Sequence, residues 1–550
     1  MDIKRIKLVE EQCLLRAIDD LGKGSKLLWI IFIINVLASL LFGINFMSYV
    51  FITEIPEYWC STPELTSTNW TTNQINNISI VDTCQRYNYN YTQLVELGYE
   101  EAVQHVKDFE SKPKIVSCSS FTFDDKEGST IVSEWQLVCD KKLHRANTFL
   151  VYSLGIMIGS AILGVYADKY GRKKSLIISI ILQIIVGPLT ALVPWFWAYV
   201  VLKFFTGVSS GSMYSSGYTI LSEVAKSNRI KLLAGILDIT FSVGTFFTIG
   251  MAYFLPHWRQ LQMAISCFVL PIVILIWFMP ESPRWLISQN RHDEARKIIE
   301  KYHKSFVMTP ISMVGNSTNE LTMSSGECHE TPNENKSCFH RNFESLRILF
   351  THPDLRKKMI IMNFSYYSAC TASFSLTLGV DYFKSSRYVY MSILAANEIL
   401  GVIAISVILM FLNVRKPLIM TYIVAFVLML TILAVPEENK NTIMGLALAG
   451  KFCISACLTG SLVFFSELFP SNVRNTAFGT CVVMAQTGAM TAPYIVDLLG
   501  DVAWWAPTTL CSMLAFIAGI LFLFIPQTEV NNKNNYNDQE EVTLSDVNPK

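Results

Sequence analysis

Ionisable residues lie inside several long apolar stretches of this 550-residue chain, among them Asp238, Glu398, Lys203 and Lys451. A charge at membrane depth costs about 3 kcal/mol on insertion scales, so it usually faces a water-filled cavity or a partner of opposite sign. Charges placed in this way are suited to hold a small charged solute. We treat Lys203 as structural or as part of ion coupling, and the other three as candidate binding residues.

The surroundings of Asp238 favour a solute site. The hydroxyl residues Thr240 and Ser242 follow it, as is typical of a wet cavity wall. The alternative is an ion pair with a lysine on a neighbouring span. Aromatic ring faces attract alkylammonium groups by about 0.5–2 kcal/mol each, although ordinary helix packing is the alternative for any single ring. The candidate rings are Tyr214, Tyr218, Phe364 and Tyr367.

Membrane-spanning helices must carry these residues. Hydrophobic residues make up 51% of the chain and charged residues 16%, which excludes a soluble protein of this size. The 44 basic residues balance the 44 acidic ones, so no nucleic-acid partner is indicated. A bilayer core of ~30 Å needs ~20 apolar residues in a helix. Twelve stretches fit, near 27–50, 146–166, 175–194, 196–220, 231–255, 260–279, 358–380, 388–411, 417–435, 442–466, 475–499 and 503–525.

Basic residues in the short loops set the orientation. They gather after every second span, as in Lys169 to Lys174 and in Arg415 and Lys416, which places these loops and both termini in the cytoplasm. The expected organisation is a cytoplasmic N-terminus, a first span, a large outer loop, the rest of the first bundle, a cytoplasmic linker, a second bundle and a disordered cytoplasmic tail. Their ranges are 1–25, 26–51, 52–144, 145–279, 280–357, 358–526 and 527–550.

The 52–144 loop has features of an extracellular segment. It holds four cysteines, an even set suited to disulfides in an oxidising compartment, and sequence alone leaves all three pairings open. These are Cys60, Cys84, Cys118 and Cys139. The loop also carries three Asn-X-Ser/Thr triplets, which make Asn69, Asn77 and Asn90 candidate glycosylation sites.

Two segments six spans apart are alike. SEVAKSNRIKLLAG follows span four and SELFPSNVRNTAFG follows span ten, and in each a glutamate closes a helix and an arginine follows it. Glu223 and Arg229 thus correspond to Glu467 and Arg474. This repetition indicates two six-helix bundles related by an axis along the membrane normal.

Two further motifs belong to the first half, and the first of them follows span two. GVYADKYGRKK starts at Gly164; that glycine allows close helix approach, and Gly171 allows a tight turn. The same motif places the opposite charges of Asp168 and Arg172 at the membrane face.

The second motif, PESPRWLISQ, follows span six. Its Glu281 and Arg284 lie at a helix exit and are suited to pair with the Glu223 and Arg229 region.

The GVYADKYGRKK motif resembles the cytoplasmic latch of the major facilitator superfamily, which holds one conformation by ion pairing and releases in the other. PESPRWLISQ resembles both sugar porters and the organic cation/anion/zwitterion transporter family. The long cysteine-bearing loop, SEWQLVCDKK from Ser133 and LPHWRQLQ from Leu255 resemble the second of these families, over about residues 20–528. The resemblance implies an all-α membrane protein with twelve transmembrane helices in two pseudo-symmetric six-helix bundles, the major facilitator fold.

The resemblance also assigns expectations to single positions. A glutamate matching Glu398 faces the central cavity in that family, and Lys451 matches a basic residue important for anions or coupling. At the span-eleven position where cation-selective relatives carry aspartate and anion or carnitine-type relatives arginine, this chain has Gln486. The loop motif of the second half is reduced to FLNVRKP, so the latch is expected to close mainly through the first half.

These features predict a plasma-membrane, alternating-access transporter of small organic ions, most simply amines, organic cations or zwitterions, by facilitated diffusion or exchange. The alternative is an organic-anion exchanger. We expect no enzymatic activity, cofactor or metal, and no GxxxxGK[ST] motif for ATP-driven pumping occurs. The expected partners are the substrate and the lipid bilayer, and the sequence leaves open whether the chain is a monomer or a homo-oligomer.

Overall fold

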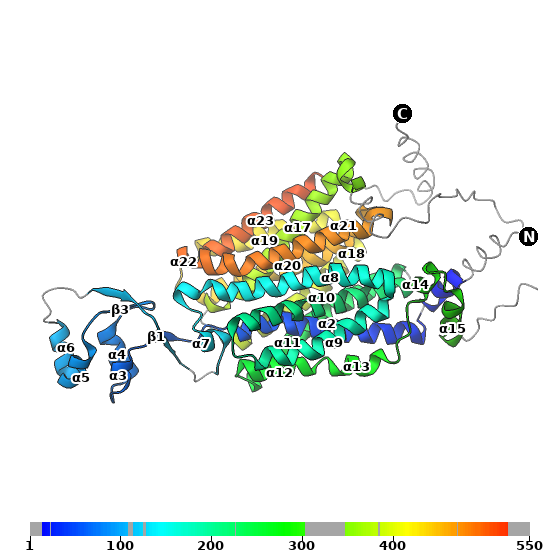
Figure 1. Ribbon diagram of the computed structural model, residues 1–550. Coiled ribbons are helices and arrows are strands. Elements are labelled where there is room, and N and C mark those ends of the chain that lie inside the picture. The colour runs from blue at the N-terminus through cyan, green and yellow to red at the C-terminus, as the bar shows by residue number, and fades with distance from the viewer. Residues whose placement is uncertain are drawn as a thin grey trace, which may run out of the picture.

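The computed structural model describes residues 14–22, 24–107, 114–124, 128–225, 227–302, 347–382, 386–469 and 471–525. Two bundles of long helices lie side by side, and the 52–144 segment extends from one end of them (Figure 1). We call that end the loop end. The opposite end, where the first span begins at Lys26 and the second ends at Tyr170, is called the terminal end.

Six spans form the first half. They are α2 (Lys26–Ile52), α8 (Leu143–Tyr170), α9 (Arg172–Leu192), α10 (Phe196–Val224), α11 (Ser227–Phe254), and α12 (Trp258–Cys267) continued by α13 (Leu270–Ile276). The sixth span is broken into two helices. Pro271 lies in the first turn of α13, where its missing N–H costs no helical hydrogen bond.

Six spans also form the second half. They are α17 (Pro353–Leu378), α18 (Arg387–Phe411), α19 (Arg415–Thr431), α20 (Lys440–Leu468), α21 (Ser471–Tyr494) and α23 (Ala506–Leu523). Short helices join them, namely η4 (Gly379–Tyr382), η5 (Ile432–Ala434), η6 (Ile495–Leu499) and α22 (Gly500–Val502). α17 begins five residues before the expected boundary at 358, because Pro353 and Asp354 form a favourable first turn.

The two halves pair their helices in the same way. The first span packs against the fifth (α2 and α11) and the second against the fourth (α8 and α10). Likewise the seventh packs against the eleventh (α17 and α21) and the eighth against the tenth (α18 and α20). Two pseudo-symmetric bundles, as the sequence repeat predicted, account for this pattern.

Two spans are more polar than the rest. Ten helices in the described ranges are long and apolar enough to cross a membrane by composition alone, and α10 and α17 are not among them. Their central stretches, SSGSMYSSGYT from Ser209 and SYYSACTASFS from Ser365, are rich in hydroxyl groups. Many of these serines are buried against other helices. The spans predicted at 196–220 and 358–380 therefore exist, but they bury polar faces inside the protein.

The 52–144 segment is a small folded unit, whereas the sequence predicted only a hydrophilic loop. Its helices are α3 (Pro63–Thr66), α4 (Thr72–Ser79), α5 (Tyr91–Leu97), α6 (Tyr99–Lys107) and α7 (Ile131–Trp135), with η2 (Cys139–Lys141) leading into α8. β1 (Tyr58–Cys60) pairs antiparallel with β5 (Phe121–Phe123). β3 (Gln85–Tyr87) pairs antiparallel with both β2 (Ile80–Asp82) and β4 (Ile115–Ser117). The spans are all helical, and in the described ranges the strands lie only in this segment.

Disulfides hold the segment together. The structure joins Cys60 to Cys118 and Cys84 to Cys139, which is one of the three pairings that the sequence left open. The candidate glycosylation residues Asn69, Asn77 and Asn90 are all exposed. Their modification stays a prediction.

The two motifs that resembled organic ion transporters contact each other at the loop end. Glu134, from SEWQLVCDKK, accepts a hydrogen bond from the Trp258 indole at 2.8 Å and forms an ion pair with Arg259, both from LPHWRQLQ. Trp135 donates to the carbonyl of Pro194 at 3.0 Å. These contacts fasten the folded segment to the first half.

The predicted linker 280–357 contains two helices, α14 (Pro283–Ser288) and α15 (His292–Tyr302), and the start of α17. Residues 303–346 of this linker lie outside the described residues. So do 1–13 of the predicted N-terminal segment and the whole predicted tail, 527–550.

Close packing of α8 on α10 requires Gly207. A Cβ at this position would lie 2.1 Å from the carbonyl oxygen of Tyr152. We expect Gly207→Ala to destabilise the protein by about 1–3 kcal/mol, because overpacking moves two backbones apart. The matched control is Gly250→Ala on α11, where a Cβ meets nothing within 4 Å and alanine is the better helix former. Thermal unfolding of the purified variants tests this, and equal midpoints would contradict it.

Candidate functional site

A buried ion pair lies between the two halves. Lys451 of α20 is 1% exposed, and its Nζ is 2.8 Å from Glu398 Oε1 of α18. The same ammonium donates to the carbonyl of Ser373 at 3.0 Å and to the hydroxyl of Thr377 at 3.2 Å, both on α17. Across the interface, the Ser242 hydroxyl of α11 donates to Glu398 Oε2 at 3.1 Å. Four spans from both halves thus meet at this pair.

This geometry changes the interpretation of Glu398 and Lys451. The sequence treated them as separate charges of opposite sign in a cavity, whereas the structure joins them into one neutral unit. Burying either charge alone would cost several kcal/mol, and pairing with further hydrogen bonds offsets that cost. Neither group is therefore left to attract a solute by its net charge in this conformation.

Asp238 differs from this pair. It lies on α11, one turn to the terminal side of Ser242 and on the same helix face, and its side chain is half-buried. Among the residues that the structure describes, it has neither an ion pair nor a hydrogen bond. The alternative of pairing with a lysine on a neighbouring span is thus not observed. Asp238 is an uncompensated carboxylate at membrane depth.

Tyrosines from both halves surround this carboxylate. Asp238 interacts electrostatically with Tyr214 and Tyr218 of α10 and with Tyr366 of α17. Tyr214 also stacks on Phe42 of α2 with ring centroids 5.2 Å apart. The structure therefore brings three of the predicted site residues together, namely Asp238, Tyr214 and Tyr218.

The other predicted residues are on the second half. Phe364 is half-buried and packs against the apolar core of that half. The Tyr367 hydroxyl lies 3.4 Å from that of Thr491 on α21. Gln486 is half-buried on α21, and its Oε1 is enclosed without a hydrogen-bond partner in the described residues. Among the described residues, none of these side chains forms a hydrogen bond or an ion pair with Asp238.

Lys203 belongs to a different environment. It is buried within the first half, donates to Gln262 Oε1 at 2.9 Å and lies over the ring of Tyr199 at 5.6 Å. Among the described residues, Lys203 forms no hydrogen bond or ion pair with the second half.

Polar contacts close the interface at the loop end. Arg145 of α8 pairs with Asp497 of η6 at 2.5 Å, and both side chains are less than 10% exposed. Lys142 pairs with Asp501 at 2.5 Å. A third pair joins Arg387 of α18 to Glu54, just beyond α2, at 3.1 Å.

Apolar contacts between the halves also lie at the loop end. One apolar cluster includes Phe46 of α2, Tyr390 of α18 and Ala489 of α21, and so spans both halves near the loop end. Phe46 and Phe374 meet across the interface with centroids 4.7 Å apart. Two other clusters, which contain the terminal-end parts of the halves, are separate, one drawn wholly from the first half and one wholly from the second. The halves thus join at the loop end and form separate cores towards the terminal end.

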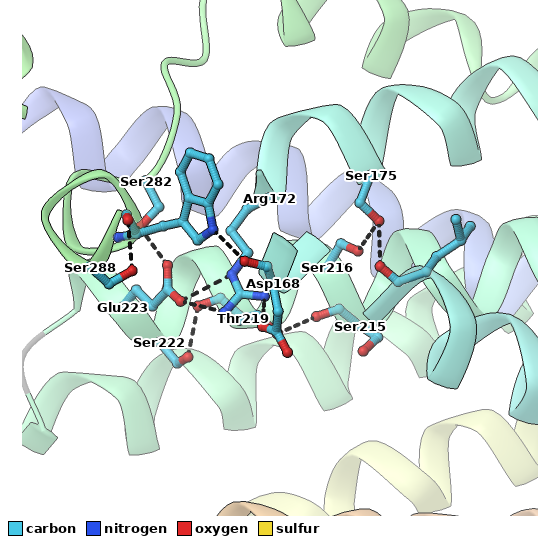
Figure 2. A network of polar contacts seen from close by, with 12 residues as sticks. Asp168, Arg172, Ser175, Ser215, Ser216, Thr219, Ser222, Glu223, Ser282 and Ser288 are labelled. Carbon is cyan, nitrogen blue, oxygen red and sulfur yellow. Dashed lines mark hydrogen bonds and ion pairs between the residues drawn. The ribbon is translucent and has the colours of Figure 1, made fainter. Parts of the chain in front are cut away.

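The predicted latch is a network at the terminal end (Figure 2). The Arg172 guanidinium pairs with Asp168 and, at 3.1 Å, with Glu223 of α10. Ser282 donates to Glu223, and the Trp285 indole donates to the carbonyl of Asp168 at 2.9 Å. The network ties α8, α9, α10 and α14 together, all within the first half.

Gly171 has a specific role beside this network. Its φ of 120° is a conformation that favours glycine. A Cβ there would lie 2.5 Å from the carboxylate of Glu281, which accepts the backbone N–H of Lys173 at 3.0 Å. Glu281 therefore caps the start of α9 instead of pairing with the Glu223 and Arg229 region.

Several latch predictions differ from the structure. Arg284 pairs with Asp19 at 2.7 Å, because α14 turns this side chain away from Glu223. Arg229 lies beside Gly24. A Cβ at Gly164 would meet nothing within 4 Å, so close helix approach does not explain that glycine here. In the second half, Arg474 donates to the carbonyl of Phe469 at 3.1 Å, and the side chain of Glu467 lies outside the described part of the chain.

Sequence reasoning missed two functional candidates. Asp497 lies inside the stretch 475–499 and is an ionisable residue at a span end, which could have marked it as the partner of a basic residue such as Arg145. Phe374 continues the helical spacing of Phe364 and Tyr367 along one face of α17. The sequence therefore marked both residues, but it did not tell that Asp497 pairs with Arg145 or that Phe374 packs against Phe46.

Comparisons with known proteins agree with this architecture. The profile of the family described as sugar (and other) transporter matches residues 31–537. The organic cation transporter protein of Drosophila melanogaster is 29% identical over 508 residues, covering 90% of this chain and 89% of that protein. Solute carrier family 22 member 1 of Bos taurus is 26% identical over 507 residues, covering 90% and 87%.

Solved structures show the same fold. The inward open conformation of the xylose transporter XylE from E. coli matches with a TM-score of 0.56 at 14% identity, over 92% of this chain and 98% of that one. The D-xylose-proton symporter gives 0.57 at 13%, over 92% and 99%.

The twelve spans and these matches define a major facilitator transporter, which is a multi-pass membrane protein and not an enzyme. The chain belongs to the sugar (and other) transporter family. Its similarity to organic cation transporters and solute carrier family 22 members along most of its length confirms the resemblance found in the loop motifs. Its function is transport across a membrane.

The buried ion pair generates a stability prediction. We expect Lys451→Met to destabilise the protein by about 3–5 kcal/mol, since Glu398 would remain buried without a counter-ion. Adding Glu398→Gln should restore most of that loss. The measurement is the thermal unfolding midpoint of the purified protein.

Lys416→Met, which removes an exposed lysine, is the matched control and should change stability by no more than about 0.5 kcal/mol. A double variant that is no more stable than Lys451→Met alone would contradict the pairing.

Proposed function

We propose that this chain carries small organic cations, or zwitterions bearing an ammonium group, across the plasma membrane by alternating access. Asp238 receives the positive charge of the substrate. The observation that carries this proposal is that Asp238 lacks a partner among the described residues, whereas Glu398 neutralises Lys451 at 2.8 Å. The charge left at the interface between the halves is therefore negative.

The aromatic environment supports the same substrate class. Tyr214 and Tyr218 lie one turn apart on α10 and interact electrostatically with Asp238. Ring faces stabilise a desolvated alkylammonium group, and a carboxylate supplies its counter-charge. A zwitterion would need a hydrogen-bond donor for its acidic group, and the amide of Gln486 and the hydroxyl of Tyr367 are the candidates on the second half.

The distribution of contacts supports alternating access. Ion pairs and an apolar cluster join the halves at the loop end, and separate clusters form towards the terminal end. We interpret this conformation as closed at the loop end and accessible from the terminal end. Rocking of the two halves about the Ser242–Glu398 contact would reverse the access.

The orientation is part of the proposal. Basic loops at the terminal end favour the cytoplasm. Two disulfides and three exposed asparagines in glycosylation triplets favour the exterior for the 52–144 segment. The proposed location is the plasma membrane, with both termini inside. With no coupling ion indicated, transport runs by facilitated diffusion or exchange.

Replacement of the unpaired carboxylate tests the substrate charge. We expect Asp238→Asn to reduce uptake of radiolabelled tetraethylammonium about 30-fold, because loss of a charged hydrogen-bond acceptor costs about 2 kcal/mol. Uptake of betaine should fall as well, and expression at the cell surface should not change. Glu437→Gln, which removes an exposed carboxylate from a loop, is the matched control.

The organic-anion exchanger makes the opposite prediction. Its site would need Lys451 as the cation, so Lys451→Gln would selectively abolish uptake of an anion such as benzoate. Anion uptake that depends on Lys451, with tetraethylammonium uptake unaffected by Asp238→Asn, would overturn the proposal.

Alternating access can be tested at the loop end. Lys142 and Asp501 come from different halves and their charged atoms lie 2.5 Å apart. We expect a Lys142→Cys/Asp501→Cys variant treated with a short bifunctional methanethiosulfonate to lose uptake, because the closed loop end is held shut. Reduction should restore uptake. Lys142→Cys alone, treated in the same way, controls for native thiols, and undiminished uptake in the cross-linked double variant would contradict the mechanism.

A further inference from the structure

A second cavity lies outside the substrate site, on the first half at the terminal end. Its volume is about 290 Å³, roughly ten times the share of one liquid water molecule. Three elements form it: the start of α9, the chain just after α13, and the last two turns of α15. It contacts neither Asp238 nor the Glu398–Lys451 pair.

Three lysines give this cavity its charge. Lys173 comes from α9, and Lys297 and Lys301, spaced four residues apart, come from one face of α15. None of the three forms an ion pair with the described residues, and no acidic residue lines the cavity. Lys301 lies over the Tyr302 ring at 5.4 Å, and no carboxylate of the described residues pairs with any of the three lysines.

Two glutamates of α15 already have arginine partners. Arg291 pairs with Glu294 at 2.6 Å, and Arg296 pairs with Glu300 at 2.9 Å. The carboxylate of Glu281 is bound by the backbone N–H groups of Lys173 and Ser282. Because these three carboxylates are bound by other groups, the three lysines are available to an external anion.

The aromatic wall places the cavity at the membrane boundary. Trp277 is 82% exposed and Phe278 65% exposed, directly after the apolar span that α12 and α13 form. Leu270 and Ile274 of α13 are also exposed and continue an apolar surface away from the cavity. Tryptophan at the end of a span is typical of the headgroup level of a bilayer. An occupant here has an anionic head beside acyl chains.

We propose that this cavity binds the headgroup of an anionic phospholipid from the leaflet at the terminal end. The lysine ammonium groups contact its phosphate and carboxylate oxygens, and its acyl chains lie along α13. Lipid bound in this way bridges α15 to α9, next to Arg172 of the latch. It therefore holds the segment after span six against the latch of the first half.

Lipid titration of the purified full chain tests this. Binding of phosphatidylserine and of phosphatidylcholine with the same acyl chains is measured by native mass spectrometry. We expect tighter binding of phosphatidylserine to the unmodified protein. Lys297→Gln/Lys301→Gln should weaken it roughly 25-fold, at about fivefold for each lysine near a charged lipid. Arg356→Gln/Lys357→Gln, which removes two exposed charges from the terminal end of the other half, should leave it unchanged.

Further measurements distinguish a bound lipid from a bound soluble anion. Inorganic phosphate should fail to displace the lipid, since it lacks the acyl chains, and displacement would point to a soluble anion and overturn the proposal. Equal binding of the two lipids, or equal losses in the two double variants, would also overturn it. Thermal midpoints in phosphatidylcholine should match for all proteins. If the α15 variant does not fold, Lys173→Gln provides the same comparison from α9.

Discussion

The cost of an uncompensated charge at membrane depth is the constraint on which this structure depends. Glu398 and Lys451 meet that constraint by pairing, with four further hydrogen bonds to residues of α11 and α17. Because the pair is neutral, it can lie between the halves in a dry environment. Asp238 lies one turn away from Ser242 and has no such ion pair or hydrogen bond among the described residues. A solute that brings its own positive charge would supply the missing compensation, which links recognition to the electrostatics of the scaffold.

The same constraint bears on the rocking motion that we propose for the halves. Within each half, large apolar clusters and close helix crossings hold the spans together. Between the halves, ion pairs such as Arg145 with Asp497 stand beside a single apolar cluster at the loop end. A buried ion pair gains Coulomb energy and loses hydration in similar amounts. Opening such a contact to water therefore changes the free energy little, whereas opening an apolar core would not. Rigid halves with a nearly balanced interface are what a rocking motion requires.

Much of this architecture follows from the sequence, for identifiable reasons. Hydropathy locates spans because every backbone polar group in a bilayer must be satisfied inside a helix, and the Glu223 and Glu467 repeat reveals the duplication. Residue type also drew attention to Asp238, whose role stays a proposal. What sequence could not supply is long-range pairing. The residues that neighbour Lys451 in the sequence do not indicate that it pairs with Glu398. Those that neighbour Arg145 do not indicate that it pairs with Asp497, 352 positions away. The fold of the 52–144 segment was missed because short strands and helices there have little hydrophobic periodicity.

The latch shows how the duplicated halves have become unequal. In the first half, Arg172 bonds to two carboxylates, and Glu281 caps α9 beside Gly171. In the second half, FLNVRKP offers Arg415, which donates to the carbonyl of Leu523 at 2.7 Å. A carbonyl holds a guanidinium through a dipole, while a carboxylate holds it through a full charge. The terminal end of the first half is consequently the more firmly tied of the two. Closure of that end must then bring the second half towards a preformed surface, with Asp168 still partly exposed to receive it.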